Sequence, residues 1–332
     1  MEKSKIVSFW KEIEQAKRIA IGGHIRPDGD CVGSCMGLYH YIREQFPEKQ
    51  VQVYLGEFPD SFRLLEGVEQ FIKPVKQQME EAEEGQAWDL FVALDSSNLE
   101  RLEFAPVFQK AVRTVCIDHH ITNEGYAMMN LVFTSSSTAE AIYDVIQGRN
   151  EKGEERPVSK AAAEALYMGI VHDTGVFKHS CTTRHTMEVA GALMERGVDT
   201  SRMIDDTFYR KSYVQNQILG QALLNSVLWE QGSVISTAVF ATDFEKYHAG
   251  KTDLDGIVDQ LRITRGVEVA VFAYETEEDS FKFSMRSNSK VDVSTIAMQF
   301  GGGGHVRAAG CTISGTYEKG LQQLLEEIRK QL

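Results

Sequence analysis

The stretch Arg18–Asp30, RIAIGGHIRPDGD, decides the fold because it runs from a buried strand straight into a turn that carries charged side chains. The segment Arg18–Ile25 is short and mostly apolar, as expected of a strand covered on both faces. Proline and glycine in the segment that follows force a turn. We therefore expect Asp28 and Asp30 to point into one space, in a segment that begins at His24.

Helices and strands alternate on both sides of this stretch. Helical apolar spacing precedes it at residues 4–17 and follows it at Val32–Phe46. This alternation predicts βαβ units and a mainly parallel sheet. The other elements predicted in this half are strands at 51–55, 90–94 and 111–117 and helices at 139–147 and 160–171.

A length of 332 residues predicts two domains. Helical patterns at 183–195 and 201–229, with no strand between them, indicate a connector. Strands and helices then alternate again, from a strand at 234–240 to a final helix that begins at Tyr317. The predicted α/β chain comprises a mainly parallel-sheet domain at 1–196, a helical connector at 197–230 and a smaller α/β domain at 231–332.

The charge balance limits the class of partner. The net charge is −13 and no dense Lys/Arg cluster is visible, so the sequence argues against a duplex DNA binder and favours short phosphate-bearing substrates. The five cysteines form no CxxC pair, which is typical of reduced thiols in a cytoplasmic protein. No signal peptide or membrane-spanning run is apparent, and we expect no membrane association.

Further acidic and imidazole side chains come just after apolar elements. Asp95 and an Asp-His-His triplet each follow an apolar strand, and a further aspartate follows an apolar helix. Alone, a strand-terminal aspartate is more often a helix cap or turn residue, but ligands of open α/β sheets gather at the carboxyl ends of strands. The residues concerned are Asp95, Asp118, His119, His120 and Asp173.

Such a cluster requires cations or protons. Carboxylates within ~4 Å of one another repel by roughly 4 kcal/mol per pair at an effective dielectric constant near 20. Mixed carboxylate and imidazole ligands suit Mn²⁺, and also Mg²⁺, Co²⁺ or Fe²⁺. Two such ions about 3.5–4 Å apart can activate a water and stabilise both oxygens of a displacement at phosphorus. We therefore expect two divalent ions, most readily Mn²⁺.

The C-terminal half contains a second candidate site. Gly301–Gly304 follow a predicted helix and expose backbone N–H groups that suit a phosphate. Arg286, at the end of a predicted strand, can bind a terminal phosphate with two hydrogen bonds, and His305 can add a third. The alternative is a flexible glycine turn beside an ordinary surface arginine. The candidate residues are Arg286, Gly301, Gly302, Gly303, Gly304 and His305.

These motifs resemble those of the DHH phosphoesterase superfamily. The segment from His24 to Ser34 and the triplet Asp118-His119-His120 resemble its signature motifs. The segment GGGGHxxAAG at 301–310 resembles the substrate-binding loop of the DHH-associated domain. The order and spacing are most similar to the nanoRNase/pAp-phosphatase group, whose members cleave very short oligoribonucleotides and remove the 3′-phosphate of adenosine 3′,5′-bisphosphate (pAp).

The resemblance implies a role for each residue of the first cluster. His24 and Asp28 would hold one metal ion; Asp30, His119 and Asp173 would hold the other; and Asp95 would bridge the two. Asp118 would orient the neighbouring imidazoles, and His120 would face the scissile phosphate. Cys31 departs from the family pattern, which usually has a small residue there, and an oxidisable thiol near the metals predicts redox-sensitive activity.

The expected activity is hydrolysis of short oligoribonucleotides, including linear dinucleotides such as pApA, or of pAp, by a two-metal hydroxide mechanism. Two alternatives stay open. One is an inorganic pyrophosphatase or exopolyphosphatase, which shares the metal motifs. The other is a catalytically silent nucleotide-binding regulator, against which the complete ligand set argues. The sequence leaves open whether the chain forms a homodimer.

Overall fold

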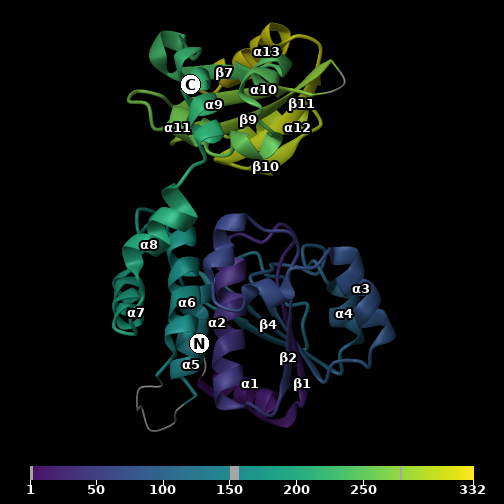
Figure 1. Cartoon of the computed structure of the whole chain (residues 1–332). Coiled ribbons are helices and arrows are strands. Elements are labelled where there is room, and N and C mark those ends of the chain that lie inside the picture. Colours follow the sequence, from purple (N-terminus) through teal and green to yellow (C-terminus); the bar gives the residue numbers. More distant parts are fainter. Residues whose placement is uncertain (1–2, 150–156, 277–278) are drawn as a thin grey trace. The chain divides into compact units, whose positions relative to one another are not determined.

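The computed structural model describes residues 3–149, 157–276 and 279–332. The chain divides into two compact units, one ending at Arg210 and the other beginning at Lys211 (Figure 1). The segment predicted as a connector, 197–230, is therefore shared between the two units. Within the described ranges, no helix combines the length and the apolar character needed to cross a membrane.

The N-terminal unit contains a five-stranded sheet in the order β2-β1-β3-β4-β5, in which every neighbouring pair is parallel. This confirms the predicted parallel sheet. The edge strand β5 was not predicted, because it has only four residues and polar neighbours. The strands are β1 (Arg18–Gly22), β2 (Gln50–Tyr54), β3 (Leu90–Leu94), β4 (Arg113–Asp118) and β5 (Met129–Val132).

Helices cover both faces of this sheet (Figure 1). One face packs against α1 (Lys3–Gln15), α2 (Gly29–Gln45), α5 (Thr138–Gln147) and α6 (Lys160–Asp173), which together enclose the larger core. The other face packs against α3 and α4 around a smaller aromatic core. The remaining helices of this unit are α3 (Val75–Glu84), α4 (Ala105–Lys110), α7 (Arg184–Met194) and α8 (Thr200–Ile204), followed by a π-helical turn at Asp205–Tyr209.

Glycines line the contact between α2 and α6 and let the two helices approach closely. A Cβ atom at Gly33 would lie 2.5 Å from the carbonyl oxygen of Ala165, and one at Gly169 would lie 2.9 Å from Oδ1 of Asp30. Real Cβ atoms do not approach neighbours so closely, so any side chain would force the backbones apart. The crossing brings the first turn of α2, with Asp30, close to the last turn of α6, which ends at Asp173.

Gly33→Ala is expected to lower the free energy of unfolding by about 1–3 kcal/mol, because the added methyl group overpacks the crossing. Gly191→Ala in α7 is the matched control. No atom lies within 4 Å of a Cβ at Gly191, so this change should raise stability by roughly 0.5–1 kcal/mol through helix propensity alone. Urea unfolding of the two variants checks both signs, and equal stabilities would contradict the packing argument.

The C-terminal unit contains a six-stranded mixed sheet in the order β10-β11-β9-β8-β7-β6. Only β7 and β8 pair in parallel. The strands are β6 (Val227–Trp229), β7 (Val234–Val239), β8 (Val269–Glu275), β9 (Ser280–Ser287), β10 (Gly303–His305) and β11 (Ala308–Ser314). The helices are α9 (Tyr213–Leu224), α10 (Ala241–Tyr247), α11 (Ile257–Arg262), α12 (Val293–Gln299) and α13 (Tyr317–Arg329).

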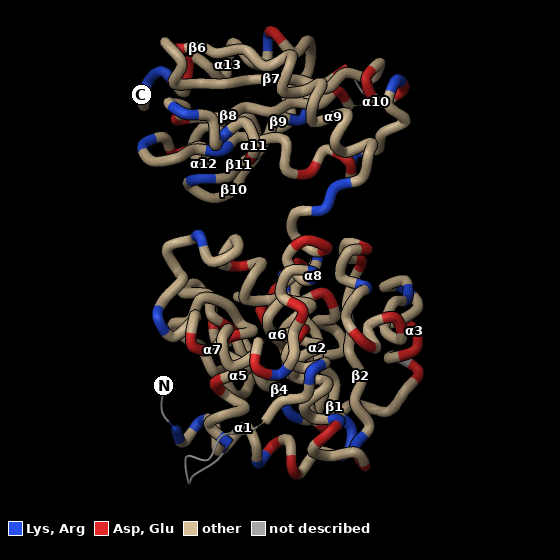
Figure 2. Tube along the Cα trace, turned by 60° about the vertical axis from the view of Figure 1, so that its left-hand side comes forward, with Lys and Arg blue, Asp and Glu red and all other residues tan. Residues whose placement is uncertain are grey.

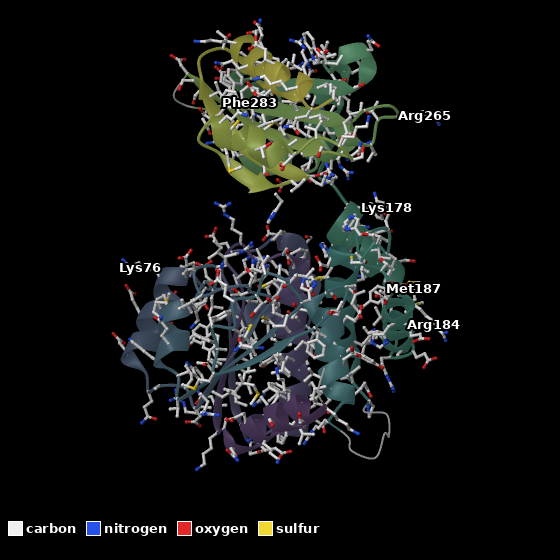
Figure 3. The ribbon with its side chains drawn as sticks, turned by 180° about the vertical axis from the view of Figure 1, so that it is seen from behind. Lys76, Lys178, Arg184, Met187, Arg265 and Phe283 are labelled. Carbon is white, nitrogen blue, oxygen red and sulfur yellow. The ribbon has the colours of Figure 1, made fainter. Side chains whose placement is uncertain are left out.

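The prediction of continuous helix at 201–229 was wrong in its middle, where residues 210–212 are not helical, and at its end. Helix α9 stops at Leu224, and Val227–Trp229 pair with β7 as an edge strand because β-branched and aromatic residues favour that pairing. Phe283 of β9 lies in the core of this unit (Figure 3), where its ring stacks on Tyr317 with a centroid separation of 6.2 Å. The unit thus has a core of its own.

Candidate metal centre

Seven of the predicted residues gather at the carboxyl edge of the N-terminal sheet, with Asp95 at their centre. The Oδ2 atom of Asp95 lies 3.4 Å from Nε2 of His24, and its Oδ1 atom lies 3.7 Å from Nε2 of His119. His119 in turn lies 3.3 Å from Asp173. The seven residues are His24, Asp28, Asp30, Asp95, His119, His120 and Asp173.

Asp95 occupies this position through a strained backbone. It follows the last residue of β3 and has a φ of 54°, in the left-handed region that only asparagine, aspartate and glycine adopt readily. The residue is 3% exposed, and its carboxylate accepts a hydrogen bond from Oγ1 of Thr138 at 3.0 Å. Strain of this kind persists where the surroundings enforce it, and it clusters at functional sites.

His24 presents one ring nitrogen to the cluster. Its Nδ1 lies 2.8 Å from the carbonyl oxygen of Ile25, which fixes the proton there and leaves Nε2 facing Asp28 and Asp95. Burial lowers the pKa of His24, but the two carboxylates outweigh burial and raise it to about 12. The two carboxylates thus favour a positive charge at Nε2, where a divalent ion could replace the proton.

Burial, together with neighbouring carboxylates, makes Asp30 and Asp173 difficult to ionise without cations. Asp30 is 1% exposed and accepts hydrogen bonds from the backbone N–H groups of Thr138 at 2.7 Å and Ala139 at 2.9 Å. Even so, burial and then the charges of Asp95 and Asp173 raise its pKa well above the ordinary value. Burial raises the pKa of Asp173 to about 6. Divalent cations would relieve this repulsion, so the donor set fits metal ions.

Acidification is expected to weaken Mn²⁺ binding more steeply below about pH 6 than above it. Asp173 has a pKa of about 6, so below that pH an additional proton must leave before the carboxylate can bind an ion. For each additional proton that the ion must displace, the Mn²⁺ affinity falls by about a further tenfold per unit decrease in pH. Titration of the metal-free chain with Mn²⁺ between pH 5 and 8 measures this. Asp173→Asn should remove the break near pH 6, and a break that survives in that variant would assign it to another group.

Asp118 lies behind the cluster and holds His120. It is buried, and its Oδ1 accepts hydrogen bonds from Nδ1 of His120 at 2.7 Å and from the backbone N–H groups of His119 and His120. Its Oδ2 accepts one from Asn123 at 2.7 Å. Burial raises the pKa of Asp118, but the hydrogen bonds outweigh it and hold the pKa below its usual range. The bond to Asp118 also raises the pKa of His120.

Four groups of side chains in the described ranges have the spacing needed to hold a metal ion; the fourth, at Glu140, Asp144 and His185, shares no residue with the other three, which overlap at this cluster. Two of these three consist of residues predicted above, and the third adds Cys31. Thr138 and Asn123 were not predicted, although both support the cluster. The polar run Ser135–Thr138 before α5 was the available signal, because serine and threonine favour helix N-termini. The three overlapping groups are Asp30, His119 and Asp173; Asp95, His119 and His120; and His24, Cys31 and Asp95.

In the C-terminal unit, Arg286 and His305 share one row of the sheet. His305 pairs with Ala308 of β11, which pairs on its other side with Arg286 of β9. Directly opposite residues point to the same face, so a small alanine separates two basic side chains. The guanidinium of Arg286 contacts Asp259 at 3.5 Å and stays partly exposed. The row can present two hydrogen-bond donors to an anion.

The four glycines play different structural parts. Gly301 has a φ of 71°, and the N–H groups of Gly301 and Gly302 donate to Met298 and Ala297, which closes the C-terminus of α12. These two N–H groups are therefore used within the chain. A Cβ at Gly302 would lie 2.1 Å from the carbonyl oxygen of Gly310, whereas one at Gly303 would meet no atom within 4 Å. A substitution at Gly303 can therefore test for contact with a ligand without disturbing the packing of the chain.

Gly303→Ala is expected to weaken substrate binding while leaving the fold intact, because only an approaching ligand would meet the new methyl group. We expect KM to rise at least about fivefold, which corresponds to roughly 1 kcal/mol. Gly302→Ala is the contrasting variant, since its methyl group collides with β11 and should lower the melting temperature. Unchanged KM in a stable Gly303→Ala variant would remove this glycine from the substrate site.

Both parts of the chain match known protein families. Residues 18–170 match the DHH family, N-terminal domain, and residues 231–332 match the DHHA1 domain. A relative from Thermus thermophilus named bifunctional oligoribonuclease and PAP phosphatase NrnA is 32% identical, over 95% of this chain and 90% of the relative. A Bacillus subtilis protein of the same name is 29% identical, over 89% of each chain. The chain therefore belongs to the DHH family.

Solved structures show the same fold. A Bacteroides fragilis protein described as exopolyphosphatase-related has a TM-score of 0.89 and 26% identity, and the match covers 99% of this chain and 96% of the other. RecJ from Thermus thermophilus in complex with Mn²⁺ has a TM-score of 0.57 and 13% identity, over 99% of this chain and 54% of the other. At that identity the likeness to RecJ concerns the fold alone.

Proposed function

We propose that this protein is a metal-dependent phosphoesterase that hydrolyses short oligoribonucleotides and the 3′-phosphate of pAp. The observation that carries the proposal is the crowded group of carboxylates and imidazoles around Asp95, in a chain whose relatives are named oligoribonuclease and PAP phosphatase. Without cations, the carboxylates in such a group repel one another. Their oxygen atoms and the imidazole nitrogen atoms are suitable ligands for divalent ions.

Two divalent ions, with Mn²⁺ as the first candidate, would be held by this group. His24 and Asp28 would hold one, and a second set would hold the other, with Asp95 shared between them. The second set is Asp30, His119 and Asp173, whose ligand atoms lie within 4.8 Å of one another. When bound, such ions lower the pKa of water and neutralise charge that develops on a phosphoryl group.

His120 is the proposed proton donor to the leaving oxygen. Its Nδ1 is fixed by Asp118, which leaves Nε2 free to face the substrate. Because the same contact raises the pKa of His120, the ring keeps its proton to a higher pH than an isolated histidine does. Asp118 itself is enclosed by hydrogen bonds and acts as a positioning residue.

Arg286, His305 and the glycine segment would bind the phosphate that is not cleaved. Arg286 supplies a planar pair of donors that match a phosphate, and the small Ala308 beside it leaves room. The proposed substrates are short single-stranded oligoribonucleotides or mononucleotide bisphosphates. Figure 2 shows basic residues interspersed with acidic ones along both units, and the net charge is −13, which supports a short substrate over a long nucleic acid.

Product analysis with Mn²⁺ tests the proposal on three substrates side by side, namely pAp, pApA and pyrophosphate. We expect AMP from pAp and pApA, and we expect its loss in Asp118→Ala and Asp173→Ala. Phosphate released from pyrophosphate alone would instead assign the chain to the pyrophosphatases and would discredit the role given to Arg286. Inactivity on all three, in a chain that still binds Mn²⁺, would favour a nucleotide-binding regulator.

A further inference from the structure

Cys31 lies against the metal centre and has no role in the proposed reaction. It is in the first turn of α2 and fully buried. Its Sγ, a ring nitrogen of His24 and a carboxylate oxygen of Asp95 lie within 4.8 Å of one another. A thiol in such surroundings is itself a potential ligand, because sulfur, imidazole and carboxylate are the donors that zinc-type sites combine.

The glycine that follows β1 leaves room for the sulfur. A Cβ atom at Gly23 would lie 2.1 Å from the Sγ of Cys31 and 3.2 Å from the carbonyl oxygen of Leu94. The sulfur therefore packs onto the residue that precedes His24, close to the residue that precedes Asp95. Any side chain at Gly23 would displace it. The glycine thus admits the thiol to the space beside two proposed metal ligands.

Cys35 provides a contrast within the same helix. It lies one turn further along α2 and is equally buried, and its Sγ lies 3.7 Å from the same Gly23 Cβ position. Among the described residues, however, Cys35 belongs to no group with metal-ligand spacing. The two thiols share burial and helix face but differ in their access to His24 and Asp95.

The spacing of the other two atoms suits a single tetrahedral ion. Bonds of about 2.1 Å to nitrogen and oxygen place two tetrahedral ligands roughly 3.4 Å apart. The observed separation of His24 Nε2 and Asp95 Oδ2 is 3.4 Å. Among the described residues, Cys31 is the one cysteine that shares a group of metal-ligand spacing with His24 and Asp95. Soft thiolate ligands favour Zn²⁺ over Mn²⁺ or Mg²⁺.

We propose that Cys31 binds, as a thiolate, the metal ion held by His24 and Asp95, and that this ligand shifts the preference of that position towards Zn²⁺ and Co²⁺. The inference rests on the proposed two-metal function. On binding, the S–H bond is broken, the proton leaves to solvent and a metal–sulfur bond forms, with no change of oxidation state. The metal selectivity of this chain would then differ from that of relatives with a small residue at this position.

Cobalt spectroscopy of the full chain tests the proposal without relying on activity. Metal-free protein is titrated with Co²⁺, and thiolate ligation produces an intense sulfur-to-cobalt charge-transfer band in the near ultraviolet. We expect this band in the unchanged chain and in Cys35→Ser, and its loss in Cys31→Ser. The visible d–d absorption of bound Co²⁺ should persist in both variants. In competition, Cys31→Ser should lower the Zn²⁺-to-Mn²⁺ affinity ratio at least about tenfold.

The outcomes separate this proposal from the function on which it rests. Bound Co²⁺ with visible absorption but no charge-transfer band would overturn the role of Cys31 and leave the metal centre standing. Loss of the band in Cys35→Ser instead of Cys31→Ser would likewise overturn it. If the unchanged chain binds no Co²⁺, Zn²⁺ or Mn²⁺, the metal centre itself fails, and the thiolate ligand fails with it.

Discussion

Asp95→Asn is expected to lower kcat for pAp by on the order of 10³-fold or more, with loss of bound metal. Among the described residues, Asp95 is the one whose carboxylate contacts both His24 and His119, so its charge would serve both ions. Removing a group that acts together with the whole cluster lowers kcat far more than the loss of one hydrogen bond does. Steady-state kinetics together with the metal content of the purified variant measure the effect.

Asparagine is the informative replacement because it changes the charge and little else. It has the same shape, tolerates the φ of 54°, and its amide oxygen can accept the hydrogen bond from Thr138. The folded state should survive, as far-ultraviolet circular dichroism would show. Asp60→Asn, at an exposed carboxylate paired with Arg63, controls for the loss of one charge. Full activity and metal content in Asp95→Asn would remove Asp95 from the proposed metal site.

Arg286→Ala is expected to raise KM for pAp by roughly 10–100-fold while changing kcat much less. A charge-assisted pair of hydrogen bonds to phosphate contributes about 1.5–3 kcal/mol to substrate binding. That contribution is the same in the bound substrate and in the transition state, so its loss raises KM and leaves kcat nearly unchanged. Asp95→Asn should show the reverse pattern, with kcat as the main loss. Initial rates over a range of pAp concentrations distinguish the two patterns.

Arg262→Ala is the matched control for this prediction. Arg262 also lies 3.5 Å from Asp259, so its removal alters the same carboxylate and the same local charge. Its guanidinium additionally donates to Asn288. We expect little change of KM in Arg262→Ala. An equal rise of KM in both variants would point to general electrostatic attraction, and a fall of kcat in Arg286→Ala at constant KM would overturn the assigned role.

Much of the N-terminal unit follows from local patterns in the sequence. The strand at Leu90–Leu94 was predicted with its observed bounds, because a fully buried strand leaves an unbroken apolar run with polar residues at both ends. Parallel pairing then places the residues after β1, β3 and β4 at one edge. For this reason Asp95 and His119 could be expected to meet although 24 positions separate them in the sequence.

The remainder depends on contacts that no local pattern contains. Strand β5 is defined by its pairing with β4 and has little apolar alternation of its own. The support that Thr138 gives to Asp30 and Asp95 depends on where the N-terminus of α5 packs. The glycine segment was predicted as a single phosphate cradle, yet the end of α12 uses the N–H groups of Gly301 and Gly302. Helix termination and ligand binding draw on the same backbone groups.

The close crossing of α2 and α6 bears on the ionic radius that the proposed metal centre could accept. Asp30 and Asp173 lie at adjoining ends of these helices, and a Cβ at Gly169 would come within 2.9 Å of the Asp30 carboxylate. Main-chain contact therefore limits how far the two carboxylates can move, and close-packed interiors are barely compressible. An ion held by the proposed site would have to match a gap of nearly fixed width. Glycines that touch no ion would thus take part in discriminating large cations from small ones.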